Sequence, residues 1–248
     1  MVTVEQLLAF LEQKAPFALA EDWDNSGLLV GDLSQTVSKV LVVLDITDTA
    51  VDRAVECGAQ LIVSHHPVIF EPLRTLSASH PAYRMAAHGI AALCMHTNLD
   101  KAVGGVNDLL AQQVGLTDVF VADDGFTRVG KLPFSMTAAQ FGEEVSRALK
   151  TEIRISMGTA PITTVAVCGG SGADLVLPLL TTVDAAVTGE VKHHEWLTVP
   201  HEKTLIDGGH FMTEIAIVSQ LTTWLQEAFP AITVVNGEQT PPYQTIKG

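Results

Sequence analysis

Short apolar runs in this sequence alternate with segments of helical period. In the first half, predicted strands at Val37–Ile46, Ala59–Ser64 and Ile90–Met95 are separated by predicted helices at Thr47–Cys57 and Ala82–His88. Such runs are typical of strands buried on both faces of a sheet. The alternation therefore predicts an α/β fold built from βα units.

A second cycle of the same kind begins near Val119. Thr137 and Gln140 form a predicted capping box for a helix that continues to Lys150. The predicted strands of this half are Ile153–Met157, Thr164–Cys168, Ala185–Val187, Lys203–Ile206 and Ile232–Val235. Further helices are predicted at Val4–Glu12, Val106–Val114, Ala173–Leu180 and Phe211–Phe229.

The length of 248 residues favours two domains. We place the first α/β domain at residues 1–122 and the second at residues 123–230. Residues 231–248 are a candidate addition to the first domain, because the last predicted strand could return to its sheet.

The charge and the cysteines restrict the classes of partner. A formal net charge of −14 argues against nucleic acid and against anionic membranes as partners. The three cysteines are far apart and form neither a disulfide framework nor a paired zinc motif. The N-terminus lacks the pattern of a signal peptide, and no apolar run is long enough for a membrane span. We therefore expect a cytoplasmic protein.

Several predicted strands end directly in polar residues of the types that bind ligands. The segments that follow these strands are His65–Pro67, His96–Asp100, Gly169–Gly172, Thr188–Glu190 and Asp207–His210. In open α/β sheets, ligands bind beyond the carboxyl ends of the strands. The pattern therefore predicts that these ends share a cleft.

His65 and His66 follow one predicted strand without a break. On an extended backbone their side chains point in opposite directions, and Pro67 favours an extended conformation for His66. Two neighbouring metal ions could each bind one of these imidazoles. A single ion bound by both would require a kink in the backbone between the two histidines. The alternative interpretation is a pair of histidines in a surface loop.

His210 and Glu214 are four residues apart at the start of the predicted long helix, so they share one face. They could bind one cation, and the carboxylate could bridge two. The alternative is a capping histidine followed by a solvated glutamate, which the helix dipole favours. Asp100 lies just past a strand end and is a third candidate ligand. Its alternative role is to open a turn.

His96 could be a ligand, a residue that orients a ligand, or a proton carrier. We prefer an orienting or acid–base role, because the other candidates already suffice for two metal ions with open positions. These candidates are His65, His66, Asp100, His210 and Glu214. Nitrogen and oxygen ligands without thiolate suit two divalent ions such as Zn, Mn, Fe, Co or Ni. An open site of this kind favours hydrolysis of a small-molecule substrate.

Three other segments have competing interpretations. His193 and His194 form a rival metal site, and the alternative is a helix start that faces solvent. Glu21–Leu28 is interpreted as a solvated acidic loop. Gly169–Gly172 resembles a phosphate-binding loop but lacks the spacing of a known fingerprint.

Seven short motifs in series resemble the Nif-three-like family, whose members are often named GTP cyclohydrolase I type 2. The motifs are WDNSGLLVG at 23–31, SHHP at 64–67, HTNLD at 96–100, GGVND at 104–108, CGGSG at 168–172, TGEVKHH at 188–194, and His210 with Glu214. They span most of the chain, and their order is that of the family.

The resemblance implies two α/β domains with a dinuclear metal site in the cleft between them, and a toroidal homohexamer. By motif, His65, His66, Asp100, His210 and Glu214 match the family's ligands. The name implies opening of the purine ring of GTP by metal-activated water with loss of formate, in which His96 would carry protons. Some relatives insert a further domain, for which this chain is too short. The alternative functions to a hydrolase are a non-catalytic metal-binding protein, such as a metal chaperone or sensor, and a hexameric scaffold.

Overall fold

The computed structural model describes residues 1–244 and 246. The chain forms two compact units, which we describe one at a time. Unit 1 comprises residues 1–103 and 217–248, and unit 2 comprises residues 104–216. The sequence placed the divisions near residues 122 and 230. The helix at Val106–Gln113 packs on the sheet of unit 2, and this contact accounts for the earlier division in the structure.

Unit 1 is built on a five-stranded sheet in the order β13-β4-β5-β6-β2. Its strands are β2 (Gly27–Val30), β4 (Lys39–Val43), β5 (Leu61–Ser64), β6 (Ala91–Cys94) and β13 (Thr233–Asn236). β13, β4, β5 and β6 are parallel, and β2 pairs antiparallel with β6. β1 (Val2–Thr3) and β3 (Thr36–Val37) form a separate two-stranded sheet.

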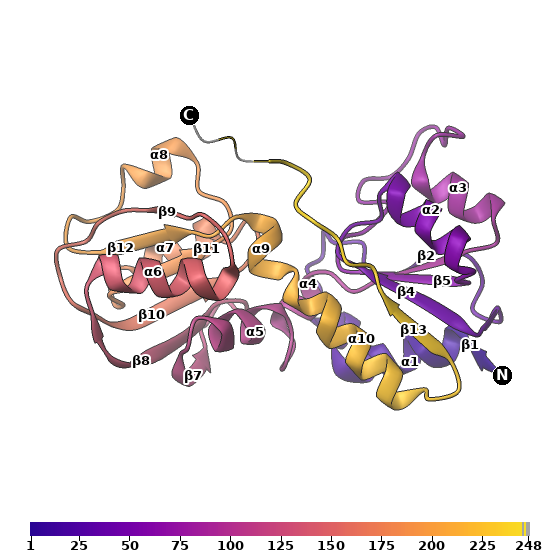
Figure 1. The fold of residues 1–248 in the computed structure, drawn as a ribbon, viewed down its shortest axis with the longest axis horizontal. Coiled ribbons are helices and arrows are strands. Elements are labelled where there is room, and N and C mark those ends of the chain that lie inside the picture. The colour runs from indigo at the N-terminus through magenta and orange to yellow at the C-terminus, as the bar shows by residue number, and fades with distance from the viewer. Residues whose placement is uncertain (245, 247–248) are drawn as a thin grey trace. The chain divides into compact units, whose positions relative to one another are not determined.

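Helices cover both faces of the sheet in unit 1 (Figure 1). They are α1 (Val4–Lys14), η1 (Phe17–Leu19), α2 (Asp48–Cys57), α3 (Pro81–Ala87), α4 (Thr97–Lys101) and α10 (Ala216–Ala228). On one face, Leu41 and Ile62 pack against Val51 of α2 and Met85 of α3. On the other face lie α1 and α10, and the ring of Phe10 in α1 contacts that of Phe229, the residue that follows α10.

Unit 2 is built on a six-stranded sheet in the order β7-β8-β10-β11-β12-β9. Its strands are β7 (Thr117–Val121), β8 (Arg128–Met136), β9 (Arg154–Ile155), β10 (Ile162–Cys168), β11 (Ala185–Thr188) and β12 (Thr204–Asp207). The central strands β10, β11 and β12 are parallel, whereas both edges are antiparallel. We predicted neither the β7–β8 hairpin nor β2. β7 and β8 mix polar and apolar residues and so lack the apolar run of a central strand. β2 is a four-residue apolar segment that overlaps the stretch interpreted as an acidic loop, and its residues are only half-buried.

The helices of unit 2 also lie on both faces of its sheet. They are α5 (Val106–Gln113), α6 (Ala138–Leu149), α7 (Ala173–Leu179), α8 (His193–Trp196) and α9 (His210–Glu214). Phe141 of α6 packs with Leu110 of α5 and Val165 of β10, and Val176 of α7 packs with Ala186 on the opposite face. The predicted capping box is confirmed, since Thr137 and Gln140 bond each other's backbone N–H groups.

The predicted long helix Phe211–Phe229 is divided at Ile215 into α9 and α10. The apolar positions keep a three- and four-residue spacing across the junction, so the periodicity could not reveal the interruption. Within the described residues, no helix combines the length and apolar character needed to cross a membrane.

Candidate metal centre

Three histidines of unit 1 gather where its parallel strands end. His65 and His66 follow β5, and His96 comes shortly after β6. One ring nitrogen from each lies within 4.8 Å of the others, so the three could hold a metal ion. The His65 side chain is fully buried, whereas those of His66 and His96 are 22% and 15% exposed.

The predicted splay of the neighbouring histidines is wrong. The ring centroids of His65 and His66 are 4.8 Å apart, because the backbone bends after Ser64 instead of continuing as an extended strand. The Ser64 hydroxyl donates to the carbonyl of His66 across 2.8 Å and holds this bend. Both imidazoles therefore serve one cluster.

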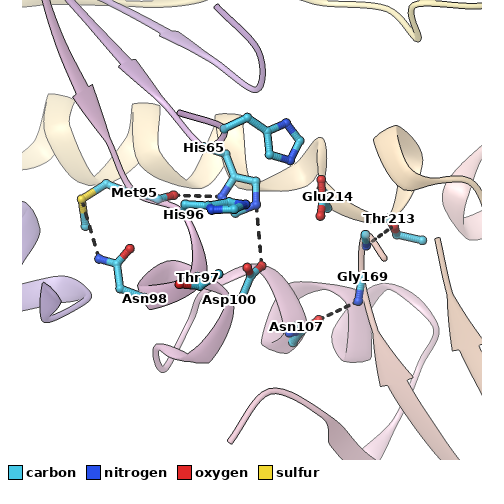
Figure 2. Close-up of polar contacts among 12 residues, drawn as sticks. His65, Met95, His96, Thr97, Asn98, Asp100, Asn107, Gly169, Thr213 and Glu214 are labelled. Carbon is cyan, nitrogen blue, oxygen red and sulfur yellow. Dashed lines mark hydrogen bonds and ion pairs between the residues drawn. The ribbon is translucent and has the colours of Figure 1, made fainter. Parts of the chain in front are cut away.

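The Nδ1 atom of each of these histidines faces an oxygen that can only accept a hydrogen bond. His65 donates to the Met95 carbonyl at 2.9 Å, as Figure 2 shows. His66 donates to Asp45 at 2.8 Å, and His96 donates to Asp24 at 2.7 Å. With the proton on Nδ1, the lone pair resides on Nε2, the tautomer that a metal ligand needs.

Asp24 corrects the interpretation of Glu21–Leu28 as a solvated loop. Its side chain is fully buried and accepts hydrogen bonds from His96, from Ser26 and from both the N–H and the hydroxyl of Thr97. Burial opposes ionisation, but the bonds from His96 and Thr97 hold the pKa of Asp24 well below its usual range. Composition alone could not identify this residue, although the WDNSG motif contains it.

Asp100 lies in α4 and adds a carboxylate to the cluster of unit 1. One of its oxygens is 3.6 Å from Nε2 of His65, and its side chain is 15% exposed (Figure 2). The rings of Trp23 and Phe70 lie beside His96, with centroids 6.3 and 6.1 Å from that of the imidazole. These two exposed aromatic side chains border the cluster.

In unit 2, His210 and Glu214 occupy the short helix α9. The Nε2 atom of His210 is 3.1 Å from a carboxylate oxygen of Glu214, so the predicted pairing along one helix face is confirmed. The Nδ1 atom of His210 is 3.1 Å from Glu190, which sequence reasoning had not assigned as a partner. Burial raises the pKa of Glu190, but the contacts with Ser171 and His210 outweigh this effect and lower the pKa below its usual value.

The Gly169–Gly172 loop packs against Glu214 and is not an open phosphate cradle. The N–H of Gly169 donates to Asn107, and that of Gly170 donates to Thr213 (Figure 2). A Cβ atom on Gly170 would lie 2.2 Å from a carboxylate oxygen of Glu214. Glycine is therefore needed for this close approach, and the loop determines where the carboxylate lies.

His193 and His194 lie exposed in α8, as the helix-start interpretation predicted. Within the part of the chain that the structure describes, neither histidine joins a group of three or more possible metal ligands. The rival metal site is therefore not supported.

The donor groups suit a divalent transition metal. They combine imidazole nitrogens with carboxylate oxygens and contain no thiolate, and buried His65 and Glu214 are among them. In four histidines, Nδ1 lies within hydrogen-bond distance of an oxygen acceptor, which is typical of imidazoles that bind metal through Nε2. These are His65, His66, His96 and His210. Groups of these residues could hold a metal ion.

Known proteins resemble this chain along nearly its whole length. The model of the Duf34/NIF3 (NGG1p interacting factor 3) family matches residues 2–242. A Lactococcus lactis protein named GTP cyclohydrolase 1 type 2 homolog is 32% identical over 251 residues, covering 95% of this chain and 96% of that protein. NIF3-like protein 1 of Drosophila melanogaster is 34% identical over 212 residues, covering 79% and 72%.

Solved structures share the fold. The Staphylococcus aureus protein SA1388 is 27% identical with a TM-score of 0.90, and 99% of each chain is covered. The Bacillus cereus protein related to NIF3 is 21% identical with a TM-score of 0.91 and the same coverage.

Proposed function

Because the chain belongs to the Duf34/NIF3 family, we propose that it is a metal-dependent hydrolase with two divalent ions per chain. In this proposal His65, His66, Asp100, His210 and Glu214 are the ligands of one dinuclear centre in the cleft between the units. The observation that carries it is the set of four imidazoles whose Nδ1 atoms are all held by oxygen acceptors.

The donors of unit 2 support a shared centre. His210 and Glu214 are two donors, fewer than the three or four protein ligands that a zinc-type ion usually takes. Unit 1 supplies the imidazoles of His65 and His66 and the carboxylate of Asp100. A paired centre would combine these three donors with the two of unit 2.

His96 is the proposed proton carrier. Its Nδ1–H donates to buried Asp24, so Nε2 is available to accept a proton, and the Asp24 carboxylate stabilises the imidazolium that forms. Metal ions at such ligands supply Lewis acidity and activate water. Ring opening of GTP with release of formate is the specific reaction to test, because curated relatives carry the name GTP cyclohydrolase 1 type 2 homolog.

The first test is metal content per chain, measured by mass spectrometry on protein purified without added metal or chelator. We expect about two divalent ions in the wild type and a loss of metal in His65→Ala and Glu214→Ala. His193→Ala/His194→Ala is the matched control, because it removes two exposed imidazoles outside the site. Unchanged metal content in both site variants would rule out the assignment.

The second test separates hydrolysis from metal storage. Protein loaded with Zn, Mn, Fe, Co or Ni is incubated with GTP and with other cyclic amides, and formate or ring-opened product is measured. If the protein is a hydrolase, we expect turnover in the wild type, loss of turnover in Asp100→Ala and reduced turnover in His96→Gln. Both variants should remain folded. Stoichiometric metal without turnover on any substrate would favour a metal chaperone or sensor.

We also propose a homohexamer, in line with the expectation for this family. Light scattering coupled to gel filtration measures the mass directly. Six copies of the 26.5 kDa chain are expected, and a monomeric mass would exclude this assembly.

A further inference from the structure

Unit 1 contains a cavity of about 660 Å³ beside His66. It lies between α2, the carboxyl end of β4 and the segment Gly237–Pro242 that follows β13. The lining includes His66, one of the proposed metal ligands, and its hydrogen-bond partner Asp45. The volume is within the range of pockets that bind small molecules, about 300–1,000 Å³.

The inner surface of the cavity is apolar. Leu41 and Val43 of β4 and Ala50 of α2 line it, all three are buried, and Ile46 and Val68 extend the same surface. These residues belong to one core cluster and are held by its packing. A ligand would therefore meet a preformed apolar floor.

Polar side chains of α2 line one part of the cavity, and the carboxylates of Asp45 and Glu238 line another. Thr49 and Arg53 are four residues apart, and the hydroxyls of Thr47 and Thr49 are 2.8 Å apart. Arg53 is 3.9 Å from Glu238, and the two side chains are 47% and 80% exposed, so this ion pair is weak. A guanidinium held so loosely can bind a carboxylate or phosphate in its planar, two-pronged geometry.

The outer wall is fixed to β4 by Gln239. The side-chain oxygen of Gln239 accepts from the N–H groups of Leu44 and Asp45, and its amide donates to the Asp45 carbonyl. The N–H of Gly237 donates to Val42 at 2.8 Å. These bonds hold the wall against the strand end and also hold the backbone of Asp45, whose carboxylate orients His66.

We propose that this cavity binds the non-reacting end of the substrate, an amphipathic small molecule with one carboxylate or phosphate group. Arg53 binds the anion, the hydroxyls of Thr47 and Thr49 complete its contacts, and the apolar floor takes the adjoining carbon skeleton or ring. The remainder of the molecule extends toward His66. The orientation toward His66 rests on the proposed function, whereas the binding itself does not require metal.

The test is calorimetric binding of GMP, guanosine, phenylacetate and inorganic phosphate to the full chain, with and without a chelator. We expect GMP or phenylacetate to bind, and Arg53→Ala to weaken that binding by at least about tenfold. Guanosine lacks the anion and should be insensitive to this substitution. Tighter binding of GMP would indicate that the pocket takes a phosphate group, and tighter binding of phenylacetate would indicate that it takes a carboxylate group.

Two further variants locate the binding. Arg147→Ala removes an exposed arginine of α6 in unit 2 and should leave affinity unchanged. Thr49→Trp introduces a ring at an exposed position of the cavity wall and should abolish binding while the melting temperature is retained. Absence of binding by every probe, or equal affinity in wild type and Arg53→Ala, would overturn the proposal.

The same measurements on Asp100→Ala distinguish this inference from the proposed function. Anion binding that persists in this variant supports the pocket even where metal and turnover are lost. Arg53-independent binding of all anions in a protein that still hydrolyses a substrate would overturn the pocket and leave the hydrolase intact.

Discussion

Nδ1 of His66 donates a hydrogen bond to Oδ1 of Asp45 across 2.8 Å. Since a carboxylate can only accept, this contact fixes both the orientation and the tautomer of the imidazole. Asp24 does the same for His96 at 2.7 Å, and Glu190 is 3.1 Å from His210. In each unit, the carboxylate beside a histidine therefore orients an imidazole that could hold a metal ion.

Loss of Asp45 should weaken metal binding. In Asp45→Ala the His66 ring loses its acceptor, so we expect metal affinity to fall by about 10- to 100-fold. Competition with a chromophoric chelator measures this affinity. Asp52→Ala, which removes a surface partner of Arg84, is the matched control. Equal affinities in Asp45→Ala and the control would contradict the orienting role.

Gly170→Ala should displace Glu214. Gly170 has a φ of +58°, and a Cβ atom there would lie 2.2 Å from Oε1 of Glu214. We expect reduced metal content in a folded protein. Gly58→Ala is the control, because Gly58 has a φ of +70° but no atom within 4 Å of an added Cβ. It shares the backbone strain, about 1 kcal/mol, without the contact. Normal metal content in Gly170→Ala would show that the loop does not position Glu214.

Asp184 should contribute stability that depends on pH. Burial opposes its ionisation, but hydrogen bonds from the backbone and hydroxyl groups of Thr164 and Thr163 lower its pKa to about 2. Since the pKa of the folded state lies below the usual carboxyl value near 3.9, the stabilisation is fully present above about pH 4 and is lost as pH falls through 2.

Urea unfolding of wild type and Asp184→Asn from pH 6 to pH 2.5 measures this effect. We expect the free energy of unfolding to differ between the two proteins by about 1–2 kcal/mol at pH 6, a value that allows for screening of the partly exposed carboxylate by solvent. The difference should become smaller toward pH 2.5. A difference that does not change with pH would exclude the ionised carboxylate as its cause.

Asp108→Ala should destabilise unit 2. Asp108 pairs with the guanidinium of Arg128, whose side chain is 1% exposed and also donates to the carbonyls of Gly125 and Phe126. Removing the carboxylate takes the Asp108 ion pair away from a buried guanidinium, at a cost of about 3 kcal/mol. Thermal and urea unfolding measure the loss.

The matched control for Asp108 is Glu144→Ala. Glu144 and its partner Arg147 are 51% and 65% exposed, so this pair contributes less than about 1 kcal/mol. Similar losses in the two variants would show that burial of Arg128 has no special energetic role.

Local sequence patterns predicted much of the fold. The apolar runs at 61–64, 91–94 and 185–188 form the parallel centres of the two sheets, because a strand buried on both faces requires apolar residues at successive positions. Thr137 and Gln140 predicted the start of α6, because a capping box needs only residues three positions apart. The β7–β8 hairpin was missed because its strands are partly solvated and mix polar with apolar residues, whereas the antiparallel edge strand β9 lies within the predicted strand Ile153–Met157.

Sequence by itself determined the family and the residue types of the site, because ligand-type side chains follow the strand ends in short motifs. Only the tertiary structure decided which acceptors orient them. Asp24 bonds a histidine 72 residues away, and Asp45 bonds one 21 residues away. Gln239 reaches the backbone of Asp45 from 194 residues away. Such pairings depend on the order of strands in a sheet and on bends at their ends, and these are properties of the folded chain that no local pattern encodes.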